Sequence, residues 1–308
     1  MSRRGVPTGI SGILAVDKPA GMTSHDVVAR VRRATSERRV GHAGTLDPAA
    51  TGVLVVLVGP ATRLTPYLLS ADKEYRAVVA FGTATDTDDA EGTVTETADV
   101  PEDLADDGVA RATVATLSGT RTQVPPAYSA VKRGGVPAHR AARAGTPLDL
   151  PARTVTISEA ELLGIEPGPP VAWTVSLTVS KGTYVRSIAR DLGEQLGTCA
   201  HLAALRRTRS GAVALHDART LREVECAGPD VATLFIDPVL ALGLPVVEVP
   251  EELAPRIATG SPLPERERGA EYVVVASATH VLAIHKWNDA LQRYRPLVVL
   301  PGGVARCA

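Results

Sequence analysis

Residues 52–59 read Gly-Val-Leu-Val-Val-Leu-Val-Gly, an uninterrupted apolar run between two glycines. A short run rich in β-branched residues is typical of a strand that is covered on both faces. Such a strand cannot lie at the surface, so other elements must pack against each side of its sheet. The run therefore marks the predicted centre of the core.

Further strands and helices are predicted by hydrophobic spacing. Every second residue is apolar in 171–180 and in 73–82, which predicts strands with one buried face; Tyr75 lies on the apolar face of the second. Thr23 and Asp26 stand in capping-box spacing at the start of a predicted helix over 23–35. A second helix follows residue 184, with an apolar stripe. The pattern predicts an α+β fold with a mixed, largely antiparallel central sheet and flanking helices.

The chain of 308 residues is long enough for one large domain and one small one. After about residue 243 the pattern of predicted elements changes to a short helix, a charged turn at 264–271 and three apolar stretches. We therefore predict a domain over 1–243 and a small β-rich domain over 244–308. Residues 124–153 are rich in Gly, Pro and Arg, and are predicted to be an insertion over the surface.

Apolar runs, the N-terminal residues and the cysteines indicate where in the cell the protein is expected. No apolar stretch reaches the roughly 18 residues of a membrane span, and the N-terminus does not resemble a signal peptide. The three cysteines are odd in number and widely spaced, which disfavours a disulfide framework and a zinc site. We expect a cytoplasmic protein without a membrane association.

Charge is distributed unevenly along the chain. Residues 1–70 carry nine Lys and Arg against four Asp and Glu, residues 71–110 two against twelve, and residues 111–153 seven against one. Two basic blocks around an acidic one indicate a surface for a polyanion, although simple solubility charge explains them equally well. The acidic residues 86–91 do not form an EF-hand loop, because Glu91 stands where glycine is needed.

Asp47 is the most conspicuous candidate for chemistry. It lies between Leu46 and Pro48, in a glycine-rich loop ahead of the buried run. Motifs for nucleotide binding, a serine nucleophile or a zinc protease are missing from the sequence. A carboxylate that is held ionised and shielded from water can act as nucleophile or base. Equally, Asp47 could cap the next element or brace the turn.

Six segments occur in the order found in the TruB family of tRNA pseudouridine synthases, which the chain resembles over residues 10 to about 240. They are GILAVDKPAGMTSHDVV, RRVGHAGTLDPAATGVLVV, DKEYRAVVAFGTATDTDDAEG, VPPAYSAVK, SKGTYVRSIARDLGEQLG and AHLAALRRTRSG. The resemblance implies a pseudouridine synthase fold, a PUA-like terminal domain, and isomerisation of uridine to pseudouridine at position 55 in the T-loop of tRNA. It implies neither a cofactor nor a metal.

The resemblance also assigns roles to single residues. Asp47 matches the essential catalytic aspartate, whether it attacks C1′, adds to C6 or deprotonates C2′. Tyr75 matches a tyrosine that stacks on the target base, and Arg186 matches an arginine that pairs with the carboxylate; Arg190 is by default a surface arginine. His42 matches a histidine that fills the stack left by the flipped uridine, and Leu205 an apolar wall beside the base. Without the family, Tyr75 and Leu205 would be read as core residues and His42 as a residue bonded locally in its loop.

The basic segments then become candidates for phosphate contacts, which fix register without reading sequence. Residues 124–153 resemble the RNA-gripping thumb of the family, but His139 and Ala141 stand where tyrosines often occur. The expected partner is the T-arm of tRNA, bound by a monomer without an obligatory protein partner. The candidate RNA-backbone contacts are Arg38, Arg39, Lys132, Arg133, Arg206 and Arg207.

Three other functions stay open at this point. A guide-dependent rRNA synthase would need partner proteins and a small RNA, and the length and thumb-like insertion argue against it. A tRNA-binding or folding chaperone would not need the set Asp47, Tyr75 and Arg186. A metal-dependent hydrolase would use the acidic residues 86–91, which a chelator would test.

Overall fold

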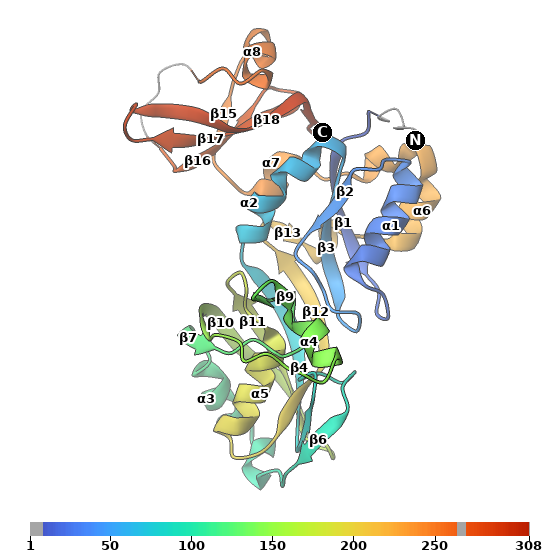
Figure 1. Ribbon diagram of the computed structural model, residues 1–308, viewed down its shortest axis with the longest axis vertical. Helices are drawn as coiled ribbons and strands as arrows, with labels where there is room; N and C mark the ends of the chain where they lie inside the picture. Colours follow the sequence, from blue (N-terminus) through green and yellow to red (C-terminus); the bar gives the residue numbers. More distant parts are fainter. Residues whose placement is uncertain (1–8, 264–268, 308) are drawn as a thin grey trace. The chain divides into compact units, whose positions relative to one another are not determined.

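The computed structural model describes residues 9–263 and 269–307, and the chain divides into two compact units (Figure 1). The second unit is Asp72–Thr208, and the first holds the described residues before and after it. The division groups segments by contact, and the predicted domain boundary at residue 243 stays a prediction.

The first unit begins with a strand that pairs with the predicted central strand, and a helix follows. Strand β1 (Gly12–Lys18) pairs antiparallel with β3 (Thr51–Val58), which also pairs with β2 (Val40–Ala43). From Gly52 to Val58, β3 is buried along both faces, so the prediction from its apolar run is confirmed. Helix α1 (Ser24–Thr35) begins at the predicted capping box of Thr23 and Asp26.

Shorter elements complete this part of the first unit. After β3 come a 3₁₀ helix η1 (Gly59–Leu64) and α2 (Thr65–Ser70). The chain returns at the end of β12 (Ala200–Ser210), which pairs with β13. The returning elements are β13 (Val213–Ala214), η3 (Leu215–Asp217), β14 (Arg219–Thr220), α6 (Leu221–Ala227), η4 (Gly228–Leu234) and α7 (Pro238–Leu242).

A separate four-stranded sheet ends the chain in the order β15-β16-β17-β18, with β15 parallel to β16 and the others antiparallel. One face packs against η1 and α2 through Val274, Ile284 and Leu300, and Arg63 donates to the carbonyl of Val299. The predicted β-rich segment is thus present and shares a core with the N-terminal part of the unit. The charged turn predicted at 264–271 falls mostly on residues 264–268, outside the described residues. The elements are β15 (Val246–Glu248), η5 (Glu251–Leu253), α8 (Ala254–Ala258), β16 (Tyr272–Ala276), β17 (His280–Asn288) and β18 (Arg293–Ala305).

The second unit is built on the antiparallel strands β4 (Lys73–Phe81), β11 (Ala172–Val179), β10 (Arg153–Glu166) and β7 (Gly119–Gln123), paired in that order. Helices α3 (Asp107–Ala115) and α5 (Val185–Gln195) contribute to the same core cluster as the apolar face of β11. Trp173 lies at its centre, fully buried, with its indole N–H donating to the carbonyl of Leu104. The strand predicted over 171–180 and the stripe of α5 are therefore confirmed, whereas burial of only one face of the strand was wrong, because Thr174 and Thr178 on its polar face are buried as well.

Two hairpins project from this sheet. Residues 86–93 of the acidic segment form the loop between β5 (Thr83–Thr85) and β6 (Val94–Thr97), and η2 (Glu102–Ala105) follows. Within the predicted insertion, β8 (Lys132–Arg133) and β9 (Val136–Pro137) pair across Gly134 and Gly135, and α4 (Ala138–Arg143) follows. Both glycines have positive φ, as a two-residue hairpin turn requires. The fold class predicted from the sequence is confirmed in both units.

Candidate active site

Asp47 lies in the loop between β2 and β3 of the first unit and is partly exposed. The residue before it, Leu46, is buried and is held at both backbone groups by one hydroxyl. The Ser24 hydroxyl, itself 1% exposed, accepts from the Leu46 N–H at 2.9 Å and donates to the Leu46 carbonyl at 3.1 Å. The peptide on the N-terminal side of Asp47 is therefore fixed to the start of α1.

The peptide on the other side of Asp47 is fixed by a buried lysine. The carbonyl of Pro48 accepts from the ammonium of Lys18 at 3.0 Å and from the N–H of Gly21 at 3.0 Å. Lys18 is fully buried and also donates to the carbonyls of Pro19 and Met22. A buried ammonium needs several acceptors to offset its lost hydration. Asp47 is thus clamped on both sides by contacts to the backbone groups of its neighbours Leu46 and Pro48.

Sequence reasoning missed Lys18 and Ser24 as supports of the loop. Both stand in the segment Lys-Pro-Ala-Gly-Met-Thr-Ser, where the motif offered a turn and a helix cap as sufficient explanations. The contacts join positions 22 and 30 residues apart, so no local pattern reveals them.

His42 lies on β2, shortly before the Asp47 loop. Its ring and that of the exposed His25 are nearly perpendicular, with a centroid distance of 5.5 Å. The two imidazoles form an aromatic pair beside the loop in the same unit. A ring in this position is suited to stack on a nucleobase, and its predicted role stays a prediction.

Tyr75 and Leu205 border the core of the second unit. Tyr75 lies on β4 opposite Leu177 of β11, and both Tyr75 and Leu205 are half-buried and pack against the same hydrophobic cluster. An aromatic ring that is half-buried at the margin of a core can offer one face to a ligand while the other is fixed by packing. The structure supports this placement, and contact with a base stays a prediction.

Arg186 lies in the first turn of α5, at the predicted strand-to-helix junction, and is 6% exposed. Its guanidinium donates to the carbonyl of Thr87 at 3.0 Å and to the carbonyl of Tyr128 at 3.0 Å. The carboxylate of Asp89 lies 3.6 Å away. Because these acceptors lie on three different residues, they fix the orientation of the planar guanidinium. Asp47 belongs to the first unit and Arg186 to the second, and their pairing stays a prediction.

Arg190 is more than the surface arginine that the sequence predicted by default. Its guanidinium lies 2.9 Å from the Asp88 carboxylate and 2.7 Å from that of Asp191, and it donates to the carbonyl of Val124. Burial by itself would lower the pKa of Arg190, but the neighbouring carboxylates raise it above its ordinary value. Arg186 and Arg190 therefore contact neighbouring residues of one loop, Thr87 and Asp88.

The candidate phosphate contacts differ in accessibility. Arg38 and Arg39 are exposed, as are Lys132 and Arg133 at the tip of the β8–β9 hairpin, where Arg133 pairs with Asp149 at 2.9 Å. Arg206 is half-buried. Arg207 is only 1% exposed, which favours a role within the protein over direct contact with phosphate. The exposed four are the better candidates for RNA backbone contacts.

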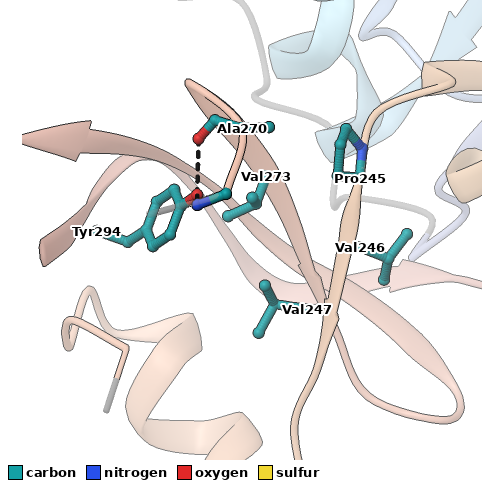
Figure 2. A pocket seen from close by; sticks show the side chains of 7 residues that line it. Pro245, Val246, Val247, Ala270, Val273 and Tyr294 are labelled. Carbon is teal, nitrogen blue, oxygen red and sulfur yellow. Dashed lines mark hydrogen bonds between the residues drawn. The ribbon is translucent and has the colours of Figure 1, made fainter. Parts of the chain in front are cut away.

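A metal site and a small-molecule site are the alternatives to a site at Asp47. In the part of the chain that the structure describes, no group of three or more His, Cys, Asp or Glu side chains could hold a metal ion, and no helix could cross a membrane. A cavity of about 340 Å³ in the terminal sheet is lined mainly by aliphatic residues (Figure 2). The Tyr294 hydroxyl in its wall donates to the Ala270 carbonyl and accepts from the Gly269 N–H. Convergent polar groups, which mark a specific ligand site, are not part of this lining.

Comparison with known proteins identifies the class. Residues 32–185 match the model of the TruB family pseudouridylate synthase N-terminal domain, and residues 186–232 match the tRNA pseudouridylate synthase B C-terminal domain. Those models describe pseudouridylate synthases.

Relatives over nearly the full length agree. A tRNA pseudouridine synthase B of Corynebacterium aurimucosum is 47% identical, with 87% of this chain and 90% of the relative covered. The corresponding protein of Thermobifida fusca is 43% identical, with 94% and 99% covered. The chain belongs to the TruB family of pseudouridylate synthases, which confirms the resemblance inferred from the sequence.

Solved structures share the fold. A Cbf5–Nop10–Gar1 complex contains a chain that is 25% identical, with a TM-score of 0.70 and 96% of this chain and 87% of that chain covered. An H/ACA ribonucleoprotein bound to a substrate RNA containing 2′-deoxyuridine gives a TM-score of 0.66 at 24% identity, with 94% and 84% covered. The second likeness shows the fold alone.

Proposed function

We propose that this enzyme isomerises uridine to pseudouridine at position 55 in the T-loop of tRNA, with Asp47 as the catalytic residue. The N1–C1′ bond of uridine breaks, the base turns, and a C5–C1′ bond forms. The proton on C5 is lost and N1 gains one, so atoms and charge balance. The reaction needs no electron carrier. The proposal therefore gives none of these residues the role of binding a cofactor.

The observation that carries the proposal is the two-sided clamp on the Asp47 loop, in a chain of the TruB family. Ser24 fixes the peptide before Asp47 and Lys18 fixes the peptide after it. Preorganisation of this kind lowers the cost of placing a catalytic group against a bound nucleoside.

The other residues have supporting roles in this proposal. The target uridine must leave the helix stack, which costs a few kcal/mol. The His42 ring fills the vacated place, while Tyr75 stacks on the extruded base and Leu205 forms an apolar wall beside it. Arg186 pairs with the Asp47 carboxylate and keeps it ionised.

Recognition of tRNA rests on shape and phosphate contact, as is usual for structured RNA. Arg38, Arg39, Lys132 and Arg133 present exposed charge for this purpose. We infer that the chain acts as a monomer in the cytoplasm, without an obligatory protein partner. The relatives at 43–47% identity are named tRNA pseudouridine synthase B, whereas the chain from the Cbf5–Nop10–Gar1 complex is only 25% identical. This contrast supports tRNA over the guide-dependent alternative.

The test uses a T-arm hairpin, the purified protein alone, and pseudouridine mapping by carbodiimide treatment and primer extension. The wild type should modify the hairpin. Asp47→Asn should lose about 10³-fold or more in rate while its affinity for the hairpin stays within about twofold of wild type. Asp103→Asn, at an exposed position in the second unit, is the matched control and should keep full activity. Pseudouridine formed by Asp47→Asn at the wild-type rate would refute the assignment of Asp47 as the catalytic residue. A wild type that forms no pseudouridine in the hairpin would refute the activity, and would leave RNA binding or chaperoning as the function.

A further inference from the structure

Two arginines on one face of α5 hold the same two segments of the second unit. Arg186 and Arg190 are four residues apart and so lie on the same side of the helix. Both contact the acidic turn 86–91, Arg186 through Thr87 and Asp89 and Arg190 through Asp88.

The second shared segment leads into the thumb-like insertion. Arg190 donates to the carbonyl of Val124 at 3.2 Å, and Arg186 donates to that of Tyr128. The Tyr128 hydroxyl in turn donates to the Asp86 carboxylate at 3.3 Å. The turn, the root of the insertion and the start of α5 therefore form one connected network.

Asp88 makes this network depend on Arg190. Its side chain is 15% exposed, and burial raises its pKa, while Arg190 and Arg186 act in the opposite direction. An ionised carboxylate in such a place requires a cation. With Arg190 present, that cation lies 2.9 Å away, and Arg186 remains directed to Thr87, Asp89 and Tyr128. Without it, Asp88 and Asp89 would compete for the single guanidinium of Arg186.

We propose that Arg190, paired with Asp88, is a positioning residue for the reaction, because it supplies the counter-charge that leaves Arg186 directed at its own acceptors. The inference rests on the proposed function, in which Arg186 supports the catalytic carboxylate. Arg190 acts through Arg186 and does not itself touch the substrate.

The chain offers a substitution that removes the charge of Asp88 and little else. Asp88 has φ of 60°, in the left-handed region that asparagine tolerates well. Its backbone is held independently, because the N–H donates to Thr85 and the carbonyl accepts from Leu202. Asp88→Asn should therefore keep the turn while it abolishes the ion pair.

The experiment measures single-turnover pseudouridine formation and hairpin affinity for the full-length wild type, Arg190→Met, Arg190→Lys, Asp88→Asn and the double variant Asp88→Asn with Arg190→Met. Arg111→Met is the matched control, because Arg111 forms an exposed pair with Asp107 in the same unit. Arg190→Met should slow the single-turnover rate about tenfold with affinity within about twofold of wild type, since misplacement of a supporting group acts on the chemical step. Arg190→Lys should recover part of the rate.

The double variant gives the decisive comparison. Removal of Asp88 should relieve the competition for Arg186, so the double variant should react faster than Arg190→Met alone once the hairpin is bound, with the same hairpin affinity, a non-additive effect on the single-turnover rate. Additive losses, or an Arg190→Met rate equal to that of Arg111→Met, would overturn the inference. If Arg190→Met does not fold, the double variant of Asp88→Asn with Arg190→Lys takes its place, and rate losses equal to the sum of those of the two single variants overturn the inference as well. A wild type that forms no pseudouridine in the hairpin would instead overturn the proposed function, and this inference with it.

Discussion

Replacement of His285 should change how the stability of the protein depends on pH. His285 lies on β17 and is fully buried, and among the described residues neither ring nitrogen has a hydrogen-bond partner. Its register partners on the two neighbouring strands, Val273 and Pro296, carry no charge. Burial alone lowers the pKa of His285 to about 4 from the ordinary 6.5.

The sign and size of the effect follow from proton linkage. Between pH 6.5 and pH 4 the unfolded chain binds a proton at His285 that the folded chain does not, so the free energy of unfolding falls as the pH falls through this window. The full difference is about 3 kcal/mol, of which about 2 kcal/mol is already lost at pH 5. Above about pH 7 the residue contributes no pH dependence.

His285→Leu should remove this contribution and also remove two buried nitrogens without partners. We expect the variant to be at least as stable as wild type at pH 7.5, and its advantage to grow by about 2 kcal/mol at pH 5. Urea unfolding can be followed by the fluorescence of Trp287, which lies two residues further along the same buried strand. A Trp173→Phe background leaves Trp287 as the sole tryptophan.

His280→Leu is the control, because His280 lies on the same strand but is half-exposed and bonded to Thr279. It leaves His285 in place, so it should keep the loss of about 2 kcal/mol that burial of His285 causes between pH 7.5 and pH 5. If His285→Leu loses as much stability as wild type between pH 7.5 and pH 5, the reasoning from burial is wrong.

Three further predictions concern the loop, the RNA surface and metal ions. Ser24→Ala leaves the buried N–H and carbonyl of Leu46 without their partner, so it should lower the free energy of unfolding by about 1–3 kcal/mol. It should also slow single turnover about tenfold while hairpin affinity stays unchanged. A normal rate would show that the contact with Ser24 does not position Asp47. Arg38→Ala with Arg39→Ala should reduce the slope of log affinity against log salt by about 1–2, while Arg111→Ala should leave it unchanged; equal slopes would remove both arginines from the phosphate contacts. Pseudouridine formation should persist at its full rate in EDTA, and a loss that Mg²⁺ or Zn²⁺ restores would contradict the expectation of metal-free chemistry.

Much of the fold was predictable because its signals are local. The apolar run of β3, the alternation of β11 and the capping box of Thr23 and Asp26 each lie within about a dozen residues, and each was found where predicted. The same holds for Arg186, whose place at the start of α5 follows from a strand pattern and a helix pattern that meet.

The contacts that organise the site were not predictable in this way. Lys18 reaches Pro48, Arg186 reaches Thr87, and Arg190 reaches Asp88 across 30, 99 and 102 residues of sequence. Each pair joins a charged group to a loop whose own sequence only predicts a turn. A lone arginine or lysine on a predicted element is exposed by default, and only its tertiary partners show that it is buried and bonded.

On the proposed function, we expect chemistry and affinity to depend on two different populations of cations. Lys18 and Arg186 are buried and bonded to backbone carbonyls, so RNA phosphates cannot contact them without loss of those bonds. Arg38, Arg39, Lys132 and Arg133 are exposed and can exchange solvent ions for phosphates at little structural cost. Substitution within the first population should change the rate of a bound complex, and within the second the salt-dependent affinity. A variant of Lys18 or Arg186 that altered only the salt slope would show that this separation is wrong, because a buried, internally bonded cation releases no counterion on binding.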